Sequence, residues 1–430
     1  MPPSDEVARG LRRAFETLGS TYVKFGQLIG SSPGAFGQAV SDEFRSCLDT
    51  GPAVPFQQVR AAVEATTGAP IGETFSSFDS TPLAAASIAV VHRATLAGGR
   101  EVAVKVLRPG IADRVALDLD IMLPLFRRLA LRGLPIGGPL YRFLGGFRTQ
   151  IAEELDLANE ARTMRHFAVL FAQAGFDNIV VPAPVDGLVG RDVLVMDFLD
   201  GVPIDDVTAI DALGHDAGPL LKDLLRSWFL TGLRDGMFHG DIHAGNLMLL
   251  RDGRMGMVDW GIVGRLDGPT HHLFRRFVEA VLGDASAWPE IVAFMQEHGP
   301  FGGASGDDGG GDVLTISEED KEEIAGILTR PFGEVSLAGA FSGPGRLGQV
   351  ERPVTRAEKR VRRDRIRAMR QRVIGSGFAD TGLAQANFML FKQLLYFERY
   401  GKMYMSDTAL MEDQAWLQKV LDESPPALTP

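Results

Sequence analysis

The sequence predicts an α+β fold class, in which a strand-rich segment lies between two mainly helical ones. Near the N-terminus, apolar residues recur at helical spacing from Leu11 to Phe25. From Thr74 to Val106 short runs rich in β-branched residues replace that spacing. Most of the chain after Val106 returns to helical patterns, interrupted by a few short apolar runs. The length of 430 residues is enough for two or three domains around a sizeable core.

The composition is that of a globular protein, with 45% hydrophobic and 23% charged residues. The net charge of −11 disfavours a general nucleic-acid binder, which is usually basic, so no nucleic-acid partner is expected. The single cysteine, Cys47, excludes an internal disulfide and favours a reducing compartment. The N-terminus lacks the apolar run of a signal peptide, and no uncharged apolar run is long enough to span a membrane. We therefore expect a cytoplasmic protein.

The N-terminal part is expected to be mainly helical up to the first strands. Pro33-Gly34 breaks the helical pattern, and a further helix is predicted from Phe56 to Ala65. Two strands are predicted next, at Ile88–Val91 and Glu101–Val106. Gly98-Gly99 lies between them, and this pair of glycines predicts a hairpin turn.

The remainder is predicted to be helical with two exceptions. Residues 111–172 form helices with a Gly/Pro-rich interruption near Leu134–Pro139, and Val193–Met196 is a buried strand. Further on, two short strands flank Asp252-Gly253 within Asn246–Val263. Helical patterns continue from there to the C-terminal region.

The strongest chemical signal is the segment from His239 to Asn246, followed by Asp259 before a glycine. Phosphoryl transfer needs a carboxylate beside the attacking group and oxygen ligands that hold Mg²⁺ against the phosphates. Asp241 and Asn246 match the spacing of a catalytic-loop base and metal ligand, and Asp259 matches a second metal ligand. The alternative is three polar residues that cap turns, but their order between apolar strands favours nucleotide and metal chemistry.

Two further patterns are formed by charged residues inside predicted strands and helices. Lys105 lies inside the apolar run Val102–Val106, and a buried lysine is costly unless it is paired. The alternative is a lysine on an exposed strand edge. Glu154, Asp156 and Glu160 lie on a predicted helical stretch, and Glu160 is rotated well away from Glu154. These acidic residues are either a solvent-exposed face of the helix or carboxylates that the helix presents to two different binding partners.

These motifs resemble those of the UbiB/AarF atypical kinases, a family associated with coenzyme Q biosynthesis. Lys24-Phe25-Gly26-Gln27 resembles its KxGQ signature, and Ala84–Ser87 resembles its alanine-rich loop. Glu154 and Asp156 resemble its ExD motif. The resemblance implies a protein-kinase-like two-lobe fold. It has an N-terminal helical extension with the KxGQ motif at 1–73, a small lobe at 74–199 and a helical large lobe at 200–430.

The resemblance also implies roles for individual residues. Lys105 would contact the α and β phosphates of ATP and pair with Glu160, and Asp241 would be the catalytic base. Asn246 and Asp259 would hold Mg²⁺. The gating residues would be Lys24 and Gln27, folded over the site, with Lys24 near Glu154 or Asp156. The nucleotide would also be bound by the alanine-rich loop and an adenine hinge, namely Ala84, Ala85, Ala86, Ser87, Met196, Asp197, Phe198 and Leu199.

The expected enzyme is an atypical kinase or ATPase with ATP and Mg²⁺ as cofactors, acting on a small-molecule or lipid acceptor in isoprenoid quinone or lipid metabolism. A small-molecule phosphotransferase of the antibiotic type and a non-catalytic, ATP-gated scaffold are the alternatives. The chain departs from the family pattern without removing a charge, at Val90, Ile242, Ala244 and Trp260. The basic run Arg356–Arg372 is interpreted as a solvated helix or as a peripheral contact with anionic lipid.

Overall fold

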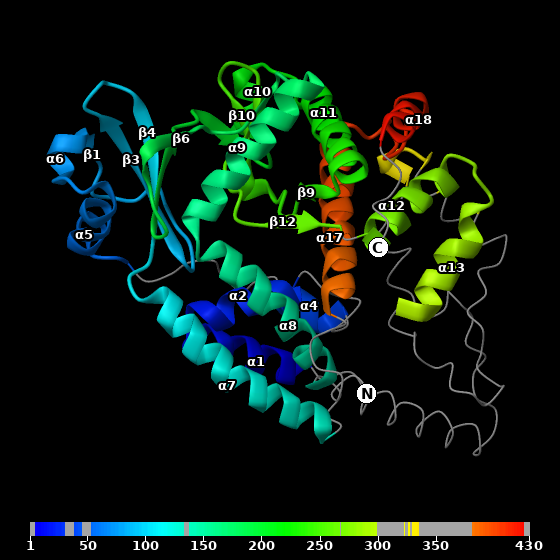
Figure 1. Cartoon of the computed structure of the whole chain (residues 1–430), viewed down its shortest axis with the longest axis horizontal. Helices are drawn as coiled ribbons and strands as arrows, with labels where there is room; N and C mark the ends of the chain where they lie inside the picture. Colours follow the sequence, from blue (N-terminus) through cyan, green and yellow to red (C-terminus); the bar gives the residue numbers. More distant parts are fainter. Residues whose placement is uncertain are drawn as a thin grey trace. The chain divides into compact units, whose positions relative to one another are not determined.

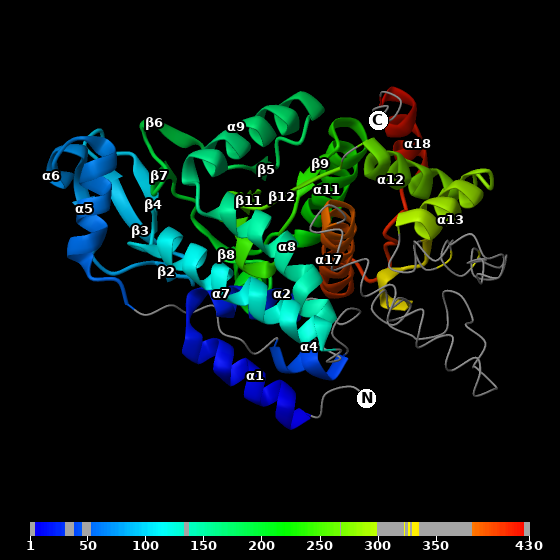
Figure 2. The same cartoon turned by 60° about the horizontal axis from the view of Figure 1, so that its bottom comes forward.

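The computed structural model describes residues 5–30, 38–44, 53–132, 137–266, 268–298, 322, 326, 329–334 and 381–424 (Figures 1 and 2). The chain forms two compact units. Unit 1 comprises Met1–Leu129, Leu134–Leu220 and Asp241–Val263, and unit 2 comprises Ala130–Gly133, Leu221–Gly240 and Gly264–Pro430. The basic run Arg356–Arg372 lies outside the described residues. The division at residues 73 and 199 stays a prediction.

A six-stranded sheet in unit 1 contains the strands predicted around Ile88–Val91, Glu101–Val106 and Val193–Met196. Its order is β1-β3-β4-β7-β6, with β2 paired to β3. Gly99 has φ 83° in the turn between β3 and β4, a conformation that glycine adopts without strain, so the hairpin is confirmed. The strands are β1 (Phe75–Phe78), β2 (Ala84–Ala85), β3 (Ala89–Leu96), β4 (Glu101–Leu107), β6 (Pro184–Val189) and β7 (Val193–Asp197).

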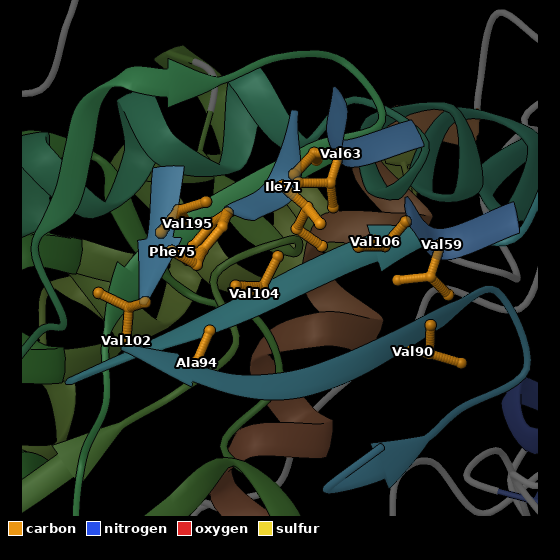
Figure 3. Close-up of a cluster of buried hydrophobic side chains, with 11 residues drawn as sticks. Val59, Val63, Ile71, Phe75, Val90, Ala94, Val102, Val104, Val106 and Val195 are labelled. Atoms are coloured by element: carbon orange, nitrogen blue, oxygen red, sulfur yellow. The ribbon is translucent and has the colours of Figure 1, made fainter. Parts of the chain in front are cut away.

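One face of this sheet is an apolar core, because alternate residues of a strand point to the same side. Val102, Val104 and Val106 of β4 are fully buried there. Two helices, α5 (Phe56–Thr67) and α6 (Ile71–Thr74), contribute apolar side chains to the same cluster (Figure 3). Burial of each such side chain contributes about 1.5–3 kcal/mol. The alternation places Lys105 on the opposite face of β4 from these valines.

Helices from the N-terminal region and from the segment between β4 and β7 contribute to a second apolar cluster in unit 1. Phe25 is fully buried, and its ring lies 5.7 Å from that of Phe126 and 5.0 Å from that of Phe147. Phe15 contacts Phe25 and Phe44 in the same cluster. Its helices are α1 (Asp5–Leu18), α2 (Ser20–Gly30), α4 (Gln38–Phe44), α7 (Ile111–Leu131, which ends in unit 2) and α8 (Gly137–Glu154), and α8 is followed by α9 (Leu157–Ala174).

A four-stranded sheet in the order β5-β11-β10-β8 completes unit 1, together with α10 (Val207–Leu213). Gly253 has φ 84° between β10 and β11, which confirms the two predicted strands around Asp252-Gly253. A short 3-10 turn, Ala244–Asn246, leads directly into β10. The strands are β5 (Ile179–Val180), β8 (Gly201–Pro203), β10 (Leu247–Leu250) and β11 (Met255–Met257).

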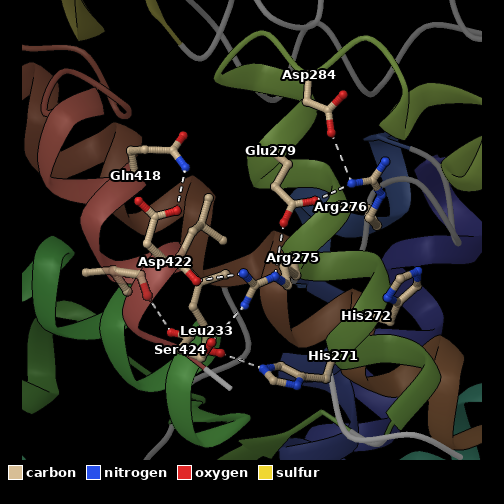
Figure 4. Close-up of polar contacts among 12 residues, drawn as sticks. Leu233, His271, His272, Arg275, Arg276, Glu279, Asp284, Gln418, Asp422 and Ser424 are labelled. Atoms are coloured by element: carbon tan, nitrogen blue, oxygen red, sulfur yellow. Dashed lines mark hydrogen bonds and ion pairs between the residues drawn. The ribbon is translucent and has the colours of Figure 1, made fainter. Parts of the chain in front are cut away.

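Unit 2 is mainly helical. Arg275 donates to Glu279 at 3.0 Å and to the carbonyl of Leu421 at 2.6 Å, so a guanidinium ties α12 to α18 (Figure 4). Among the described residues no helix is long and apolar enough to cross a membrane. Its helices and strands are α11 (Ala217–Leu230, which begins in unit 1), β9 (Met237–His239), β12 (Val263–Arg265, whose first residue belongs to unit 1), α12 (Gly268–Val281), α13 (Ala287–His298), α17 (Thr381–Tyr404) and α18 (Gln414–Glu423).

Candidate active site

Lys105 is the centre of a buried charge cluster in unit 1. Its Nζ lies 2.8 Å and 2.9 Å from the two carboxylate oxygens of Glu160, which is on the first turn of α9. Asp259, after β11, is 3.1 Å from the same Nζ. The Lys105 side chain is 12% exposed and that of Glu160 only 2% exposed. The lysine is therefore paired on the sheet face opposite the valine core, and it is not on an exposed strand edge.

The cluster holds one cation and two carboxylates, and their pKa values reflect this imbalance. Burial alone would lower the pKa of Lys105, but Asp259 and Glu160 outweigh it and raise that pKa. Burial would raise the pKa of Asp259, yet Lys105, the N–H of Gly261 and Lys24 hold it below its usual range. Burial raises the pKa of Glu160. Lys105 and Asp259 are therefore both ionised at neutral pH.

Backbone groups after Asp259 orient both carboxylates. Trp260 donates its N–H to Glu160 at 3.1 Å, and Gly261 donates its N–H to Asp259 at 2.9 Å. The indole of Trp260 is 1% exposed, and its ring lies 4.8 Å from that of Phe167. The tryptophan therefore fills the core beneath the site, where its side chain anchors the backbone that positions Asp259.

Asp241, His243 and Asn246 lie together on the turn before β10. The side-chain amide of Asn246 donates to the carbonyl of Asp241 at 2.9 Å, and Nε2 of His243 is 3.7 Å from the carboxylate of Asp241. Val258 donates its N–H to the carbonyl of Asn246 at 3.0 Å, so this turn lies against the segment that ends in Asp259.

The donor set of Asn246 and Asp259 fits a hard divalent cation. The side-chain nitrogen of Asn246 donates to the backbone carbonyl of Asp241. The Oδ1 of Asn246 therefore points away from that carbonyl and can act as a ligand. Carboxylate and amide oxygens are the ligands that Mg²⁺ prefers. The described part of the chain holds no group of three or more His, Cys, Asp or Glu that could bind a metal. A cation here would therefore draw further oxygens from phosphates and water.

The KxGQ helix α2 is linked to this cluster through Lys24. Its Nζ lies 2.9 Å from Oε2 of Glu154, the last residue of α8, and the two side chains are 18% and 7% exposed. Gln150, which sequence analysis missed, donates to the other oxygen of Glu154 at 3.2 Å. Asp156 instead caps α9, because it accepts from the N–H groups of Ala158 and Asn159 at 3.1 Å each. Gln27 is half-buried on the same helix as Lys24.

The alanine-rich segment is a strand and a tight turn. Ala84 and Ala85 form β2 and pair with Val91 and Val90 of β3. Ala86 donates its N–H to the carbonyl of Ala89 at 2.9 Å, and Ser87 is 2% exposed. No non-glycine residue in the described ranges has positive φ, so the loop adopts its shape without glycine-like backbone angles.

The predicted hinge lies at the end of β7. Asp197 donates its N–H to the carbonyl of Ala183 at 3.1 Å, and Phe198 donates its N–H to the carbonyl of Glu101 at 3.4 Å. Arg93 covers the Phe198 ring at 4.5 Å from its centroid. Met196 is buried within β7, whereas Leu199 is half-buried beyond the strand. These residues lie at one end of the same strand group that carries Lys105.

Sequence analysis missed residues whose side chains donate hydrogen bonds to distant backbone carbonyls. The guanidinium of Arg108 contacts the carbonyl of Ala86. In unit 2, Gln393 of α17 is fully buried and donates to the carbonyl of Gly240 at 2.6 Å. Neither contact has a local sequence signal, since a side chain's choice of a distant carbonyl leaves no periodic pattern.

Comparisons with known proteins give consistent matches. The model of the ABC1 atypical kinase-like domain matches residues 46–290. An uncharacterized protein of Mycobacterium tuberculosis is 36% identical over 96% of this chain and 78% of its own length. An uncharacterized chloroplastic aarF domain-containing protein kinase of Arabidopsis thaliana is 31% identical over 94% of this chain and 73% of its own. A probable protein kinase UbiB of Marinobacter nauticus is 34% identical over 61% of this chain and 49% of its own.

Proposed function

Because this chain belongs to the ABC1 atypical kinase-like family, we propose that it binds Mg-ATP and uses it in slow hydrolysis or phosphoryl transfer. The UbiB/AarF resemblance is confirmed by the same matches, and so is the protein-kinase-like two-lobe fold class. ATP binding, catalysis and the pathway are the parts that we propose.

The observation that carries the proposal is the contact of Lys105 with both Glu160 and Asp259. A lysine held this way keeps its charge and its position, so it can contact the α and β phosphates of a nucleotide. Glu160 orients the lysine from beneath. Asp259 is 42% exposed in its side chain, and it is therefore the member of the cluster that is open to a ligand.

Asn246 and Asp259 would hold Mg²⁺. When bound, Mg²⁺ supplies charge neutralisation on the phosphate oxygens. Asp241 would accept the proton of an attacking hydroxyl or water. His243, 3.7 Å from that carboxylate, helps to orient it.

The alanine-rich loop and the hinge would complete the nucleotide site. We propose that Ala84, Ala85, Ala86 and Ser87 cover the phosphates and that Met196, Asp197, Phe198 and Leu199 border the adenine. The shared sheet supports this assignment: β2 of the alanine-rich loop pairs with β3, the hinge follows β7, and β3 and β7 both pair with β4, which carries Lys105.

The ion pair of Lys24 with Glu154 supports the proposal that protein substrates have restricted access to the site, because it holds α2 beside the Lys105 cluster. A small-molecule or lipid acceptor in isoprenoid quinone or lipid metabolism is therefore proposed rather than a protein substrate. We further propose that the protein acts in the cytoplasm, with the basic run Arg356–Arg372 as a peripheral contact for anionic membranes.

The test combines Mg-ATP titration with steady-state phosphate release on wild type and Asp241→Asn. Asp186→Asn, at a 94% exposed side chain, is the matched control. We expect equal binding in all three proteins and loss of phosphate release only in Asp241→Asn. Binding without any release would indicate an ATP-gated scaffold, and absence of binding would reject the proposal. Quinone and lipid profiling of a deletion strain, rescued by wild type or Asp259→Asn, tests the pathway.

A further inference from the structure

Arg108 directly follows β4, the strand that carries Lys105, and its side chain contacts the alanine-rich loop. Nε and Nη2 both donate to the carbonyl of Ala86, at 2.9 Å and 2.7 Å. The backbone N–H of Arg108 donates to the carbonyl of Ile88 at 2.9 Å. Arg108 is only 7% exposed. Arg108 therefore contacts one carbonyl of the loop through its charged side chain and, through its backbone, the carbonyl of the residue that follows the loop.

A buried guanidinium on a carbonyl is a strong and directional contact. Hydrogen bonds to charged groups are roughly twice as strong as neutral ones, and the planar fork of arginine fixes their direction. A trans peptide is planar, so its C=O and N–H point to opposite sides. When Arg108 holds the carbonyl of Ala86, it also fixes the direction of the Ser87 N–H, on the far side of the same peptide.

We propose that Arg108 is a positioning residue that holds the Ala84–Ser87 loop in one orientation and thereby sets how the loop meets the nucleotide phosphates. This inference rests on the proposed function, because it assumes that the loop covers Mg-ATP. Arg108 itself contacts a backbone carbonyl and is not assigned a contact with the nucleotide. Its effect passes through the peptide between Ala86 and Ser87.

The first test measures the loop without nucleotide, by amide hydrogen exchange of the full chain. The reporter is the N–H of Ala86, which donates to Ala89 at 2.9 Å. Arg108→Gln should speed its exchange about tenfold, because the two charged hydrogen bonds from the guanidinium to the carbonyl of Ala86 are lost. Arg108→Lys keeps the positive charge but lacks the planar guanidinium. Its Ala86 exchange rate should lie between those of Arg108→Gln and wild type.

The matched control is Arg60→Gln, on α5 of the same unit. Arg60 lies 3.5 Å from Glu64, and its side chain is 47% exposed. It should leave the exchange of Ala86 unchanged. If Arg108→Gln does not fold, Arg108→Lys alone decides the question. Exchange of Ala86 at the wild-type rate in every folded Arg108 variant would overturn the inference.

The second test measures Mg-ATP affinity, KM and kcat on the same proteins. Arg108→Gln should weaken affinity and raise KM about tenfold with little change in kcat, because a fixed amide direction aids binding. Arg108→Lys should recover part of the affinity. A merely structural role would lower Tm but leave the KM of the folded protein unchanged, and that result would overturn the inference.

The hydrogen-exchange test and the nucleotide-affinity test together distinguish failure of the proposed function from failure of the inference about Arg108. If wild type binds no Mg-ATP, the proposed function fails, and the exchange arm still decides whether Arg108 holds the loop. If wild type binds Mg-ATP and Arg108→Gln exchanges faster yet binds equally well, the loop orientation does not control the nucleotide. The inference about Arg108 is then wrong, and the proposed function stands.

Discussion

Lys24 of α2 and Glu154 at the end of α8 form an ion pair of 2.9 Å that is largely shielded from water. The positive charge of Lys24 also contributes to the lowered pKa of Asp259. The KxGQ helix is therefore joined to the Lys105 cluster by charge. This relationship makes the position of α2 and the chemistry of the site mutually dependent.

Breaking the ion pair should loosen α2. Lys24→Met and Glu154→Gln should each increase proteolytic cleavage and amide exchange within residues 20–30, because a partly buried charge loses its partner. A double-mutant cycle should give a coupling energy of about 0.5–3 kcal/mol, the range for residues in contact. Arg9→Gln, on the exposed surface of α1, is the control. Strict additivity of the two substitutions would show that the pair does not hold the helix.

The aromatic contacts of Phe25 should hold α2 independently of the ion pair. Phe25→Ala should lower the free energy of unfolding by about 3–5 kcal/mol, since a fully buried ring is removed from between Phe126 and Phe147. Urea unfolding measures this value. Leu18→Ala, at a residue that is 46% exposed, should change it by less than about 0.5 kcal/mol. Equal effects of the two substitutions would contradict the buried position of Phe25.

The lowered pKa of Asp259 should make stability depend on pH in acid. A carboxyl whose pKa is lower in the folded state stabilises the protein above its unfolded pKa of about 4, and this contribution is lost as pH falls through the folded pKa. Between about pH 5 and pH 2, wild type should therefore lose more stability than Asp259→Asn. Denaturant unfolding across that range measures the difference. Parallel curves for the two proteins would show that Asp259 is not stabilised by Lys105.

Nucleotide binding should require a divalent cation, because Asn246 and Asp259 offer only hard oxygen ligands. ATP should raise Tm in the presence of Mg²⁺ and have little effect in EDTA. Asn246→Leu and Asp259→Ala should both abolish the Mg²⁺-dependent part of the shift. His272→Gln, on the exposed surface of α12, should retain it. A full ATP shift in EDTA would reject the metal assignment.

Removing one Cβ from the alanine-rich loop should let it approach the phosphates more closely. Ala86→Gly should therefore bind Mg-ATP more tightly and label itself more in radiolabel transfer, with a loss of biological rescue. The change in stability should be small, about 0.4–1 kcal/mol. The double variant with Asp241→Asn should keep the tighter binding and lose the labelling. Unchanged affinity and labelling in Ala86→Gly would show that the loop does not cover the phosphates.

Local patterns in the sequence were sufficient for several strands, but they missed the short strands β5, β6, β8, β9 and β12. The glycine pair at 98–99 predicted the β3–β4 hairpin, and alternation along β4 separated its valines from Lys105. These features depend on neighbours within a few residues, so the sequence contains them directly. The ordered motifs likewise indicated the family, because each combines an unusual set of residues at short spacing.

The tertiary structure decided which partner each charge takes. The sequence offered Lys24 either Glu154 or Asp156, and the structure pairs it with Glu154 while Asp156 caps its own helix. It also revealed Arg108 on the carbonyl of Ala86. Such contacts join residues that are far apart in the chain or use backbone carbonyls that every residue carries. Their selection depends on how helices and strands pack, which periodicity and composition do not encode.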